Sequence, residues 1–359
     1  MTNSFLSHAD AAFRNRNTIV HYVKKHRLVS RTDIWENLDI SRAAVTKIVR
    51  NLQESNILME TVQGESTGGR KPLFLIFNGK RHLFFAFDWS FHCLYLMDLN
   101  GDIYFETTLS FQEQVSPSSF VDTLSSAMYN ILENCKIPKD CLSGLLLAMP
   151  GIIDPKNCTI LSSVELGWQN INLHDLFTEN FGQNIYVERT GNILVLSAGT
   201  HLKKNYAHIQ LFTLGTDGIG VSSLIHGSCQ HGEWCMHGEL GHIKLMSDVQ
   251  CRCGQTGCLE AIVKQLFEKS NCKLTDEILD YLAIGISTSV NICDSHIVLI
   301  GSYVDLMDAT QKEYLINSIR NKITSSLLRQ FDVHFANNKK QLMLNGLCDY
   351  MFEQIFPVE

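Results

Sequence analysis

The stretch Glu233–Ile262, EWCMHGELGHIKLMSDVQCRCGQTGCLEAI, decides how the rest of this chain is interpreted. It contains four cysteines and two histidines within thirty residues. Such a concentration fits a catalytic metal centre, a structural metal site or a set of unrelated buried thiols. The remainder of the sequence has to distinguish between these three.

The bulk composition indicates a soluble globular protein. The 359 residues are enough for two or three domains, and 45% of them are hydrophobic while 19% are charged. The N-terminus lacks the pattern of a signal peptide, and the longest apolar run, LSGLLLAMPGII (142–153), is too short to span a bilayer. We therefore expect a cytoplasmic protein without membrane contacts. Its twelve cysteines should stay reduced, so that clustered cysteines point to metal.

The cysteine spacing favours a structural zinc site. The expected Zn²⁺ ligands are His242, Cys251, Cys253 and Cys258. Gly254 and Gly257 allow the chain to turn sharply enough for three thiolates to converge, and one imidazole completes a closed tetrahedral set. A catalytic zinc would instead keep one position open for water. Three neighbours are alternative ligands but are more simply ordinary loop residues: His231, Cys235 and His237.

Charge is distributed unevenly along the chain. Residues 1–80 contain 12 Lys and Arg against 7 Asp and Glu, which leaves 18 against 30 for residues 81–359 out of totals of 30 and 37. A basic module joined to an acidic body suggests a nucleic-acid-binding region at the N-terminus.

Three helices are expected in the basic module, from TIVHYVKKH (18–26), SRTDIWENL (30–38) and SRAAVTKIVRNLQESNIL (41–58). Ser30 and Ser41 are typical N-caps for the second and third helices. The third helix presents small and cationic side chains on one face, which suits the major groove of DNA. The residues assigned to DNA contact here are Ser41, Arg42, Ala43, Thr46, Lys47 and Arg50.

A hairpin wing is expected next, because LMETVQGESTGGRKPLFLIFN (58–78) has two strand-like runs around a polar, Gly-rich turn. Arg70 and Lys71 at its tip are assigned to a DNA phosphate or the adjacent minor groove, with Gly68 and Gly69 permitting close approach of the backbone. The plainer alternative is a three-helix domain with a solvated cationic face. The order of helix, turn, helix and basic wing favours DNA binding.

From Leu83 onward, strand-like runs alternate with helical ones, which indicates two α/β lobes with a cleft between them. The expected boundaries are 1–80 for a winged helix-turn-helix domain, 81–200 for the first lobe and 201–359 for the second, with a C-terminal helix that can return to the first lobe. The segment GTDGIG (215–220) follows a strand and is a phosphate-binding turn or, as we favour, a tight hairpin.

The segment GELGHIKLMSDVQCRCGQTGCLEAI (238–262) resembles the signature of the ROK family of repressors, open reading frames and sugar kinases, in which E-x-G-H precedes C-x-C-G-x-x-G-C-L-E. The resemblance extends over nearly the whole chain. GGRKP (68–72) is similar to the winged helix of the repressor branch, and AMPGIID (148–154), LGWQNINL (166–173) and YLAIGISTSVNICDSHIVLIG (281–301) occur in the expected order. The resemblance implies lobes of the actin-like ATPase and sugar-kinase type.

Three parts that the family's kinases need for phosphoryl transfer differ in this chain. DWSFH (88–92) replaces the glycines of an Asp-x-Gly-Gly-Thr phosphate turn with bulky side chains. VERTGN (187–192) places Arg189 and Thr190 where the family has Asn and its catalytic Asp, and threonine does not act as a general base near neutral pH. GSYVD (301–305) lacks the glycine pair of the adenosine end. We therefore expect no enzyme activity and no catalytic residues.

The resemblance also implies that Glu239, His242 and Glu260 contact sugar hydroxyls, with His242 doing so while it ligates zinc. Further neighbours expected in the pocket are Gly151, Trp168 and Asn170. The plainer alternative is that both glutamates only support the zinc loop. Thr190 removes one sugar contact relative to the family pattern.

Together these features predict a transcriptional regulator, most simply a repressor of carbohydrate-use genes. Residues 1–80 would bind a double-stranded DNA operator, and the lobes would bind a sugar or sugar derivative. A homodimer or higher homo-oligomer is expected. Two alternatives stay open: a DNA-binding regulator controlled by a protein partner without a sugar effector and, less favoured, an active ROK sugar kinase.

Overall fold

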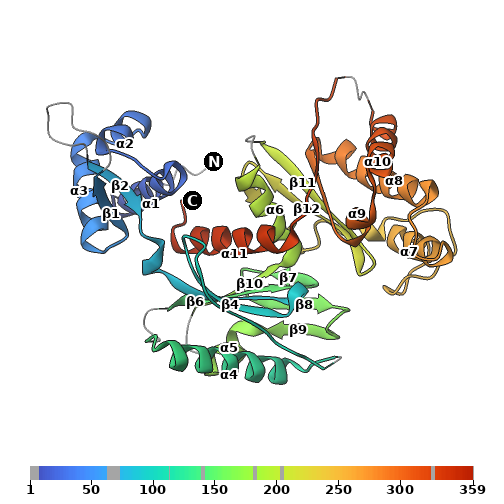
Figure 1. The fold of residues 1–359 in the computed structure, drawn as a ribbon, viewed down its shortest axis with the longest axis horizontal. Coiled ribbons are helices and arrows are strands. Elements are labelled where there is room, and N and C mark those ends of the chain that lie inside the picture. Colours follow the sequence, from blue (N-terminus) through green and yellow to red (C-terminus); the bar gives the residue numbers. More distant parts are fainter. Residues whose placement is uncertain are drawn as a thin grey trace.

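The computed structural model describes residues 8–62, 73–112, 114–138, 142–180, 184–202, 206–324 and 328–358. Figure 1 shows an N-terminal helical module and two α/β regions, with the C-terminal helix lying between them. Within the described ranges, every helix is too short or too polar to cross a membrane.

The N-terminal module contains three helices and one hairpin: α1 (His8–His26), α2 (Arg31–Asn37), α3 (Arg42–Glu54), β1 (Leu58–Val62) and β2 (Leu73–Phe77). The strands β1 and β2 pair in antiparallel register from Leu58 opposite Phe77, which confirms the two strands of the expected hairpin. The expected tip, including Gly68, Gly69, Arg70 and Lys71, lies outside the described residues.

The side-chain caps of this module agree with the sequence pattern. Ser30 caps α2 in a reciprocal capping box with Asp33, and the Ser41 hydroxyl accepts the Ala44 N–H at the start of α3. Helix α1 begins at His8, ten residues before the apolar run that predicted it. Its first turns contain alanines and the exposed Phe13 but carry no buried hydrophobic stripe, so their helical state has no signal in the periodicity.

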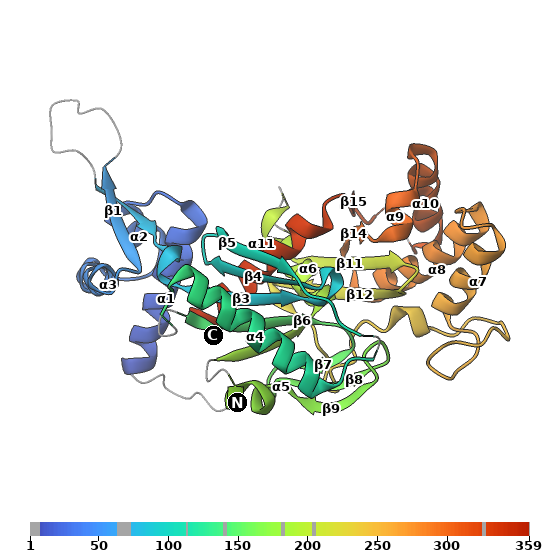
Figure 2. The same ribbon diagram turned by 60° about the horizontal axis from the view of Figure 1, so that its bottom comes forward.

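The first lobe contains a five-stranded sheet in the order β10-β6-β3-β4-β5. Its strands are β3 (Leu83–Asp88), β4 (Cys93–Asp98), β5 (Ile103–Thr108), β6 (Leu142–Met149) and β10 (Ile185–Arg189). Beside it lies a three-stranded sheet of β7 (Ile152–Asp154), β8 (Thr159–Ser163) and β9 (Trp168–Asn172). The helices are α4 (Pro117–Cys135) and α5 (Leu173–Asn180), and Figure 2 shows α4 lying across the main sheet.

The second lobe repeats this strand order in the sheet β13-β12-β11-β14-β15. Its strands are β11 (His208–Gly215), β12 (Gly218–Ile225), β13 (Ser228–Cys229), β14 (His296–Ile300) and β15 (Val333–Phe335). Its helices are α7 (Leu259–Lys269), α8 (Asp276–Cys293), α9 (Ser302–Leu306) and α10 (Ala309–Lys322). Gly215 pairs with Gly218 across a two-residue turn, which confirms the hairpin expected at GTDGIG.

Two helices join the lobes: α6 (Thr190–His201) and α11 (Lys339–Ile355). Alternate residues of β3 face opposite sides of the first sheet, so that Phe85 and Phe87 pack toward α4 while Phe84 and Ala86 belong to a core shared with α6 and α11. At Gly346 of α11 an added Cβ would lie 2.2 Å from the Ile193 carbonyl oxygen of α6. A glycine is therefore required for the two helices to approach this closely.

Candidate metal centre and ligand-binding residues

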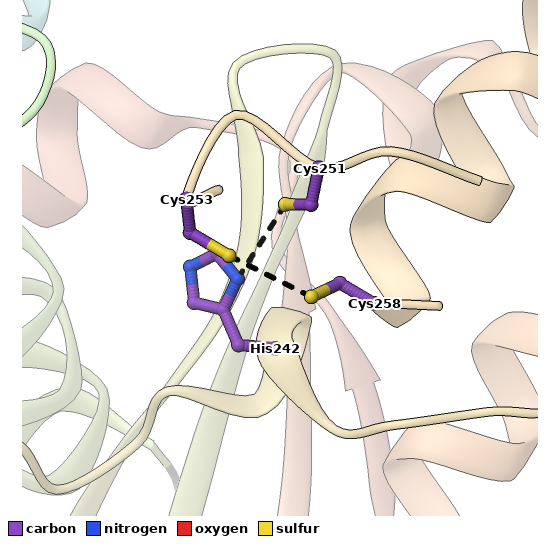
Figure 3. Close-up of side chains that lie close together, drawn as sticks. All are labelled: His242, Cys251, Cys253 and Cys258. Atoms are coloured by element: carbon purple, nitrogen blue, oxygen red, sulfur yellow. Dashed lines mark hydrogen bonds between the residues drawn. The ribbon is translucent and has the colours of Figure 1, made fainter. Parts of the chain in front are cut away.

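Four candidate metal ligands converge in the second lobe. The ligand atoms of His242, Cys251, Cys253 and Cys258 all lie within 4.8 Å of one another, and Figure 3 shows them facing a common centre. The Sγ atoms of Cys253 and Cys258 are 3.7 Å apart, as are Cys251 Sγ and His242 Nδ1. Zinc–sulfur bonds of about 2.3 Å in a tetrahedron would place two sulfurs about 3.8 Å apart. The arrangement has the size and donor set of a closed tetrahedral metal site.

Local turns bring these ligands together. His242 ends a short 3₁₀ turn (Leu240–His242), and the bridges Lys244–Cys258 and Gln250–Thr256 fold the loop back on itself. Gly257 has φ +73°, and an added Cβ there would lie 2.6 Å from the Leu245 carbonyl oxygen. This glycine is the position at which the tight loop excludes any side chain.

The electrostatic surroundings differ between the cysteines of the cluster. Lys244 Nζ lies 3.1 Å from Cys258 Sγ and donates to it. Burial first, and then hydrogen bonds with neighbouring groups, raise the pKa of Cys251 to about 12. Burial opposes ionisation of Cys253, but the Gln255 N–H and the neighbouring thiols outweigh it and lower the pKa of Cys253. A bound dication would deprotonate all three thiols and release protons on binding.

The alternative ligands have other partners. His231 Nε2 lies 2.7 Å from Glu188 Oε2, and His237 Nε2 lies 2.8 Å from the Ser223 hydroxyl. The hydrogen bond with Glu188 is the main reason why the pKa of His231 is raised, whereas burial followed by the charge of Arg189 lowers the pKa of His237. These residues join the loop to strands instead of completing the cysteine cluster.

The three residues expected to contact sugar lie together beside the cluster. Glu260, at the start of α7, is buried, and its Oε1 lies 3.8 Å from His242 Nδ1 and 3.2 Å from Arg252 Nε. Glu239 is more accessible, and its Oε2 lies 3.8 Å from His242 Nε2. The imidazole therefore stands between two carboxylates, with one nitrogen toward the thiols and the other toward Glu239.

Gly151, Trp168 and Asn170 belong to the first lobe, and the contacts that unite Glu239, His242 and Glu260 do not include them. Gly151 follows β6 at φ +110°, where an added Cβ would lie 2.4 Å from the Ser162 carbonyl oxygen. Trp168 is buried and donates to the Val115 carbonyl, while Asn170 is exposed on β9. The structure therefore gives Trp168 a role in the core of the first lobe.

A residue that the motif comparison treated only as a departure makes one of the contacts between the lobes. Arg189, at the end of β10, donates from Nη1 to the His237 carbonyl at 2.8 Å and lies 3.6 Å from Glu239 Oε1. The adjacent Glu188 accepts from Asn192 and contacts His231. The signal in the sequence was a charged pair at the end of a buried strand, but the partners of this pair in the second lobe lie more than forty positions away.

The turn that would hold phosphate in the kinases is filled by aromatic side chains. Trp89 packs against Phe87, Phe111 and Phe120, and its Nε1 donates to Glu165 at 2.5 Å. Asp88 is fully buried, and burial raises its pKa to about 6. The turn is therefore part of an apolar core.

At the opposite turn, a cavity of about 300 Å³ lies between the β11–β12 hairpin, the cysteine loop and α7. Its polar lining residues include Thr216, Arg252, Glu260 and Lys264. Arg252 Nη2 donates to the Asp217 carbonyl at 2.8 Å and so ties the cysteine loop to the tip of the hairpin.

The residues assigned to DNA contact on the third helix form one face of α3. All six are exposed: Ser41, Arg42, Ala43, Thr46, Lys47 and Arg50. The Arg42 guanidinium lies 3.8 Å from the centre of the Trp35 ring, which holds it at the edge of the face, and Arg50 pairs weakly with Glu54 at 3.6 Å. The opposite face, with Val45, Val49 and Leu52, is buried.

The central part of the chain matches a family of known proteins. Residues 94–266 match the family described as ROK family. The xylose repressor of Bacillus spizizenii is 24% identical over 349 residues, covering 88% of each protein. Among solved structures, a ROK family transcriptional regulator described as a homolog of the E. coli MLC protein has a TM-score of 0.80 at 17% identity and covers 96% of this chain and 97% of its own.

A kinase of the same fold is less similar. The ROK hexokinase from Thermus thermophilus has a TM-score of 0.59 at 18% identity, and covers 76% of this chain and 98% of its own. Residues 94–266 therefore match a ROK family domain, and the chain shares the fold of a ROK transcriptional regulator over nearly all of its length.

Proposed function

We propose that this protein is a DNA-binding transcriptional regulator, a repressor of carbohydrate-use genes, that responds to a sugar or sugar derivative. The observation that carries the proposal is the exposed face of α3, where Arg42, Lys47 and Arg50 stand clear of the module's core beside an antiparallel hairpin. A helix of this kind fits the major groove, and the hairpin fits the place of a wing. Arg70 and Lys71 are proposed to contact the DNA backbone from the wing.

Support for a sugar effector comes from Glu239, His242 and Glu260. Carboxylates and an imidazole fix the directions of hydroxyl groups, and rigid support from a metal loop would hold them in place. Xylose repressors are among the relatives that align along most of the chain. Gly151 and Asn170 are proposed to join this site from the first lobe when the lobes close.

We propose structural Zn²⁺ at His242, Cys251, Cys253 and Cys258. A closed set of one imidazole and three thiolates is typical of structural zinc. The metal would fix the loop that carries Glu239 and position Glu260 at the start of α7.

Phosphoryl transfer is proposed to be lost. Trp89 occupies the first phosphate turn, and the Thr190 hydroxyl, which lies 3.4 Å from the Met149 carbonyl, stands where the resemblance places a catalytic carboxylate. An operator read by two modules would require a homodimer or higher oligomer, acting in the cytoplasm where the DNA is.

The DNA-binding half is tested with a duplex selected by the full-length protein from a random library. Arg42→Ala and Arg50→Ala should each weaken binding by about 1–3 kcal/mol, measured by fluorescence anisotropy at fixed salt. Arg320→Ala, an exposed arginine of α10, is the matched control and should bind as the wild type does. Unchanged binding in both α3 variants would remove α3 as the contact surface.

The sensing half is tested by thermal-shift screening against neutral sugars, amino sugars and sugar phosphates, because a ligand of the folded state raises the melting temperature. Calorimetry of a hit should show a saturable site that Glu239→Gln weakens. Absence of any shift in zinc-loaded protein would favour the alternative regulator, in which Arg189 holds Glu239 and a protein partner supplies the signal.

A further inference from the structure

Helix α11 connects the DNA-binding module with the body of the protein. At its C-terminal end, the Phe356 carbonyl lies 2.7 Å from His21 Nε2, and the Pro357 carbonyl accepts from Asn17 Nδ2 at 2.6 Å. Both donors are on α1. Lys24, one turn further along α1, lies 3.8 Å from the centre of the Phe352 ring. The module is therefore docked on the last turns of α11.

One carboxylate on α11 contacts both neighbouring helices. Asp349 Oδ2 accepts from the Thr200 hydroxyl at 2.6 Å and lies 3.1 Å from His201 Nε2, and both of these partners end α6. Asp349 Oδ1 lies 3.7 Å from Lys24 Nζ of α1. The Asp349 side chain is only 16% exposed, whereas its partners Lys24 and His201 are 25% and 48% exposed.

The charge of Asp349 is stabilised by its partners. Burial alone would raise the pKa of this carboxyl, but the His201 hydrogen bond, the Lys24 charge and the Thr200 hydrogen bond outweigh it and lower the pKa. The ionised form is therefore the one held between α1 and α6.

The opposite end of α6 lies at the ligand-binding residues. Helix α6 starts at Thr190, directly after Glu188 and Arg189, which contact the loop that carries His231 and Glu239. Its twelve residues span about 18 Å and contain no proline that would interrupt the helix. We expect a movement of the loop against β10 to displace the Thr200–His201 end as well.

We propose that Asp349 is the positioning residue that couples the ligand-binding loop to the DNA-binding module, by linking the end of α6 to Lys24 of α1. The inference rests on the proposed function, since it requires a module that binds DNA. It assigns a specific side chain to the transmission step that the function leaves open. By reciprocity, a loop ligand that changes the affinity for DNA is itself bound with an affinity that DNA changes by the same factor. If Asp349 carries this coupling, DNA bound to the module should alter the end of α6 that contacts Asp349.

Apolar packing keeps the module docked without this carboxylate. Ile19, Val20 and Val23 of α1 are buried in the same core as Phe352 of α11 and Phe356, which directly follows this helix. The module should therefore remain attached, with its α3 face unchanged, when the Asp349 charge is lost. The link from the end of α6 to Lys24 of α1 should be lost with that charge.

Amide hydrogen exchange of the full-length, zinc-loaded protein, with and without the selected duplex, tests this without any sugar. In the wild type, duplex binding should change exchange in α1 and also at the Thr200–His201 end of α6. In Asp349→Asn, duplex affinity should stay within about threefold, while the change in α6 should fall about fivefold or more. Lys24→Gln removes the partner of Asp349 on α1 and should have the same effect. It provides the test if Asp349→Asn folds poorly.

Asp280→Asn is the matched control. Asp280 accepts from Ser318, Lys322 and Tyr314 within the second lobe, so it loses a comparable set of contacts far from α1. This variant should keep the α6 response. A wild type that binds duplex with α6 unaffected, or variants that keep the full α6 response, would overturn the role of Asp349 alone. A wild type that binds no duplex would remove the DNA-binding function, and the inference with it.

Discussion

The two lobes share one strand order but stabilise their first hairpin in different ways. In the first lobe the β3–β4 turn is packed by Trp89 into an aromatic core, whereas in the second lobe the β11–β12 turn is polar and is held by Arg252 from the cysteine loop. Apolar burial is insensitive to ligands, while a polar turn next to Glu260 and a candidate metal site can respond to them. The comparison thus distinguishes a turn buried in an aromatic core in one lobe from a polar turn beside a candidate metal site in the other.

Loss of the metal should have the largest effect on this contrast. Cys253→Ser should release the proposed zinc and disorder the loop of the second lobe, since structural zinc binds zinc-finger peptides with about 10–16 kcal/mol and this binding is coupled to their folding. Metal content by atomic absorption and the melting temperature check this. Cys272→Ser, at an exposed cysteine outside the cluster, should retain one equivalent of zinc and full stability. Full metal content in Cys253→Ser would show that the cluster is not the metal site.

Removal of the Trp89 side chain from the β3–β4 turn should have the next largest effect on stability. Trp89→Ala should lower the free energy of unfolding by about 3–5 kcal/mol, because Trp89 is 9% exposed and leaves a cavity among Phe87, Phe111 and Phe120. Trp234, which is 74% exposed, offers the control: Trp234→Ala should change stability by about 0.5 kcal/mol or less. Equal losses in the two variants would contradict a packed turn. Protection of the wild type by Mg-ATP would point to a working phosphate site.

The contact between the lobes should depend on pH. His231 has a raised pKa in the folded protein, so its ion pair with Glu188 stabilises the fold fully below the ordinary histidine value of 6.5 and loses this contribution as pH rises through the folded pKa. His231→Gln should therefore cost about 1–2 kcal/mol near pH 6 and clearly less near pH 8.5. Denaturation of both proteins at the two pH values measures the difference. The exposed His174 provides the control, and His174→Gln should show little pH-dependent loss.

A change at Arg252, which holds the β11–β12 turn against the cysteine loop, should have the smallest effect on stability. Arg252→Lys keeps the charge but loses the simultaneous contacts with Glu260 and the Asp217 carbonyl. Because Arg252 is exposed, we expect a stability loss of about 1 kcal/mol or less. A weaker response to the sugar hit in calorimetry should accompany it. An unaltered calorimetric response would show that the Arg252 contacts play no part in ligand binding.

Local patterns predicted much of this molecule. Ser30 and Ser41 predicted the starts of two helices, and the glycines of GTDGIG predicted the hairpin. Both predictions were possible because capping and turn preferences act over a few residues. The cysteine spacing predicted a cluster for the same reason, and the structure brings its four residues together. The start of helix α1 was predicted too late, because its first turns lack a periodic pattern of buried apolar residues.

Contacts between distant segments had no such signal. Arg189 meets Glu239 across fifty positions, and Asp349 meets Thr200 across 149. Single polar residues carry no periodicity, so only the folded structure reveals their partners. Arg189 at the end of β10 meets the loop that carries Glu239, and Asp349 of α11 meets the end of α6. The candidate ligands could be read from motifs, whereas the route from the ligand loop to the DNA-binding module required the fold.

The most direct test of the account is the affinity of the zinc-loaded protein for its selected duplex, measured by anisotropy with and without each sugar that raises the melting temperature. The account predicts that at least one sugar changes the apparent Kd by about fivefold or more, and that Glu239→Gln abolishes this change. Duplex affinity that stays constant across every sugar that binds would contradict a sugar-responsive regulator.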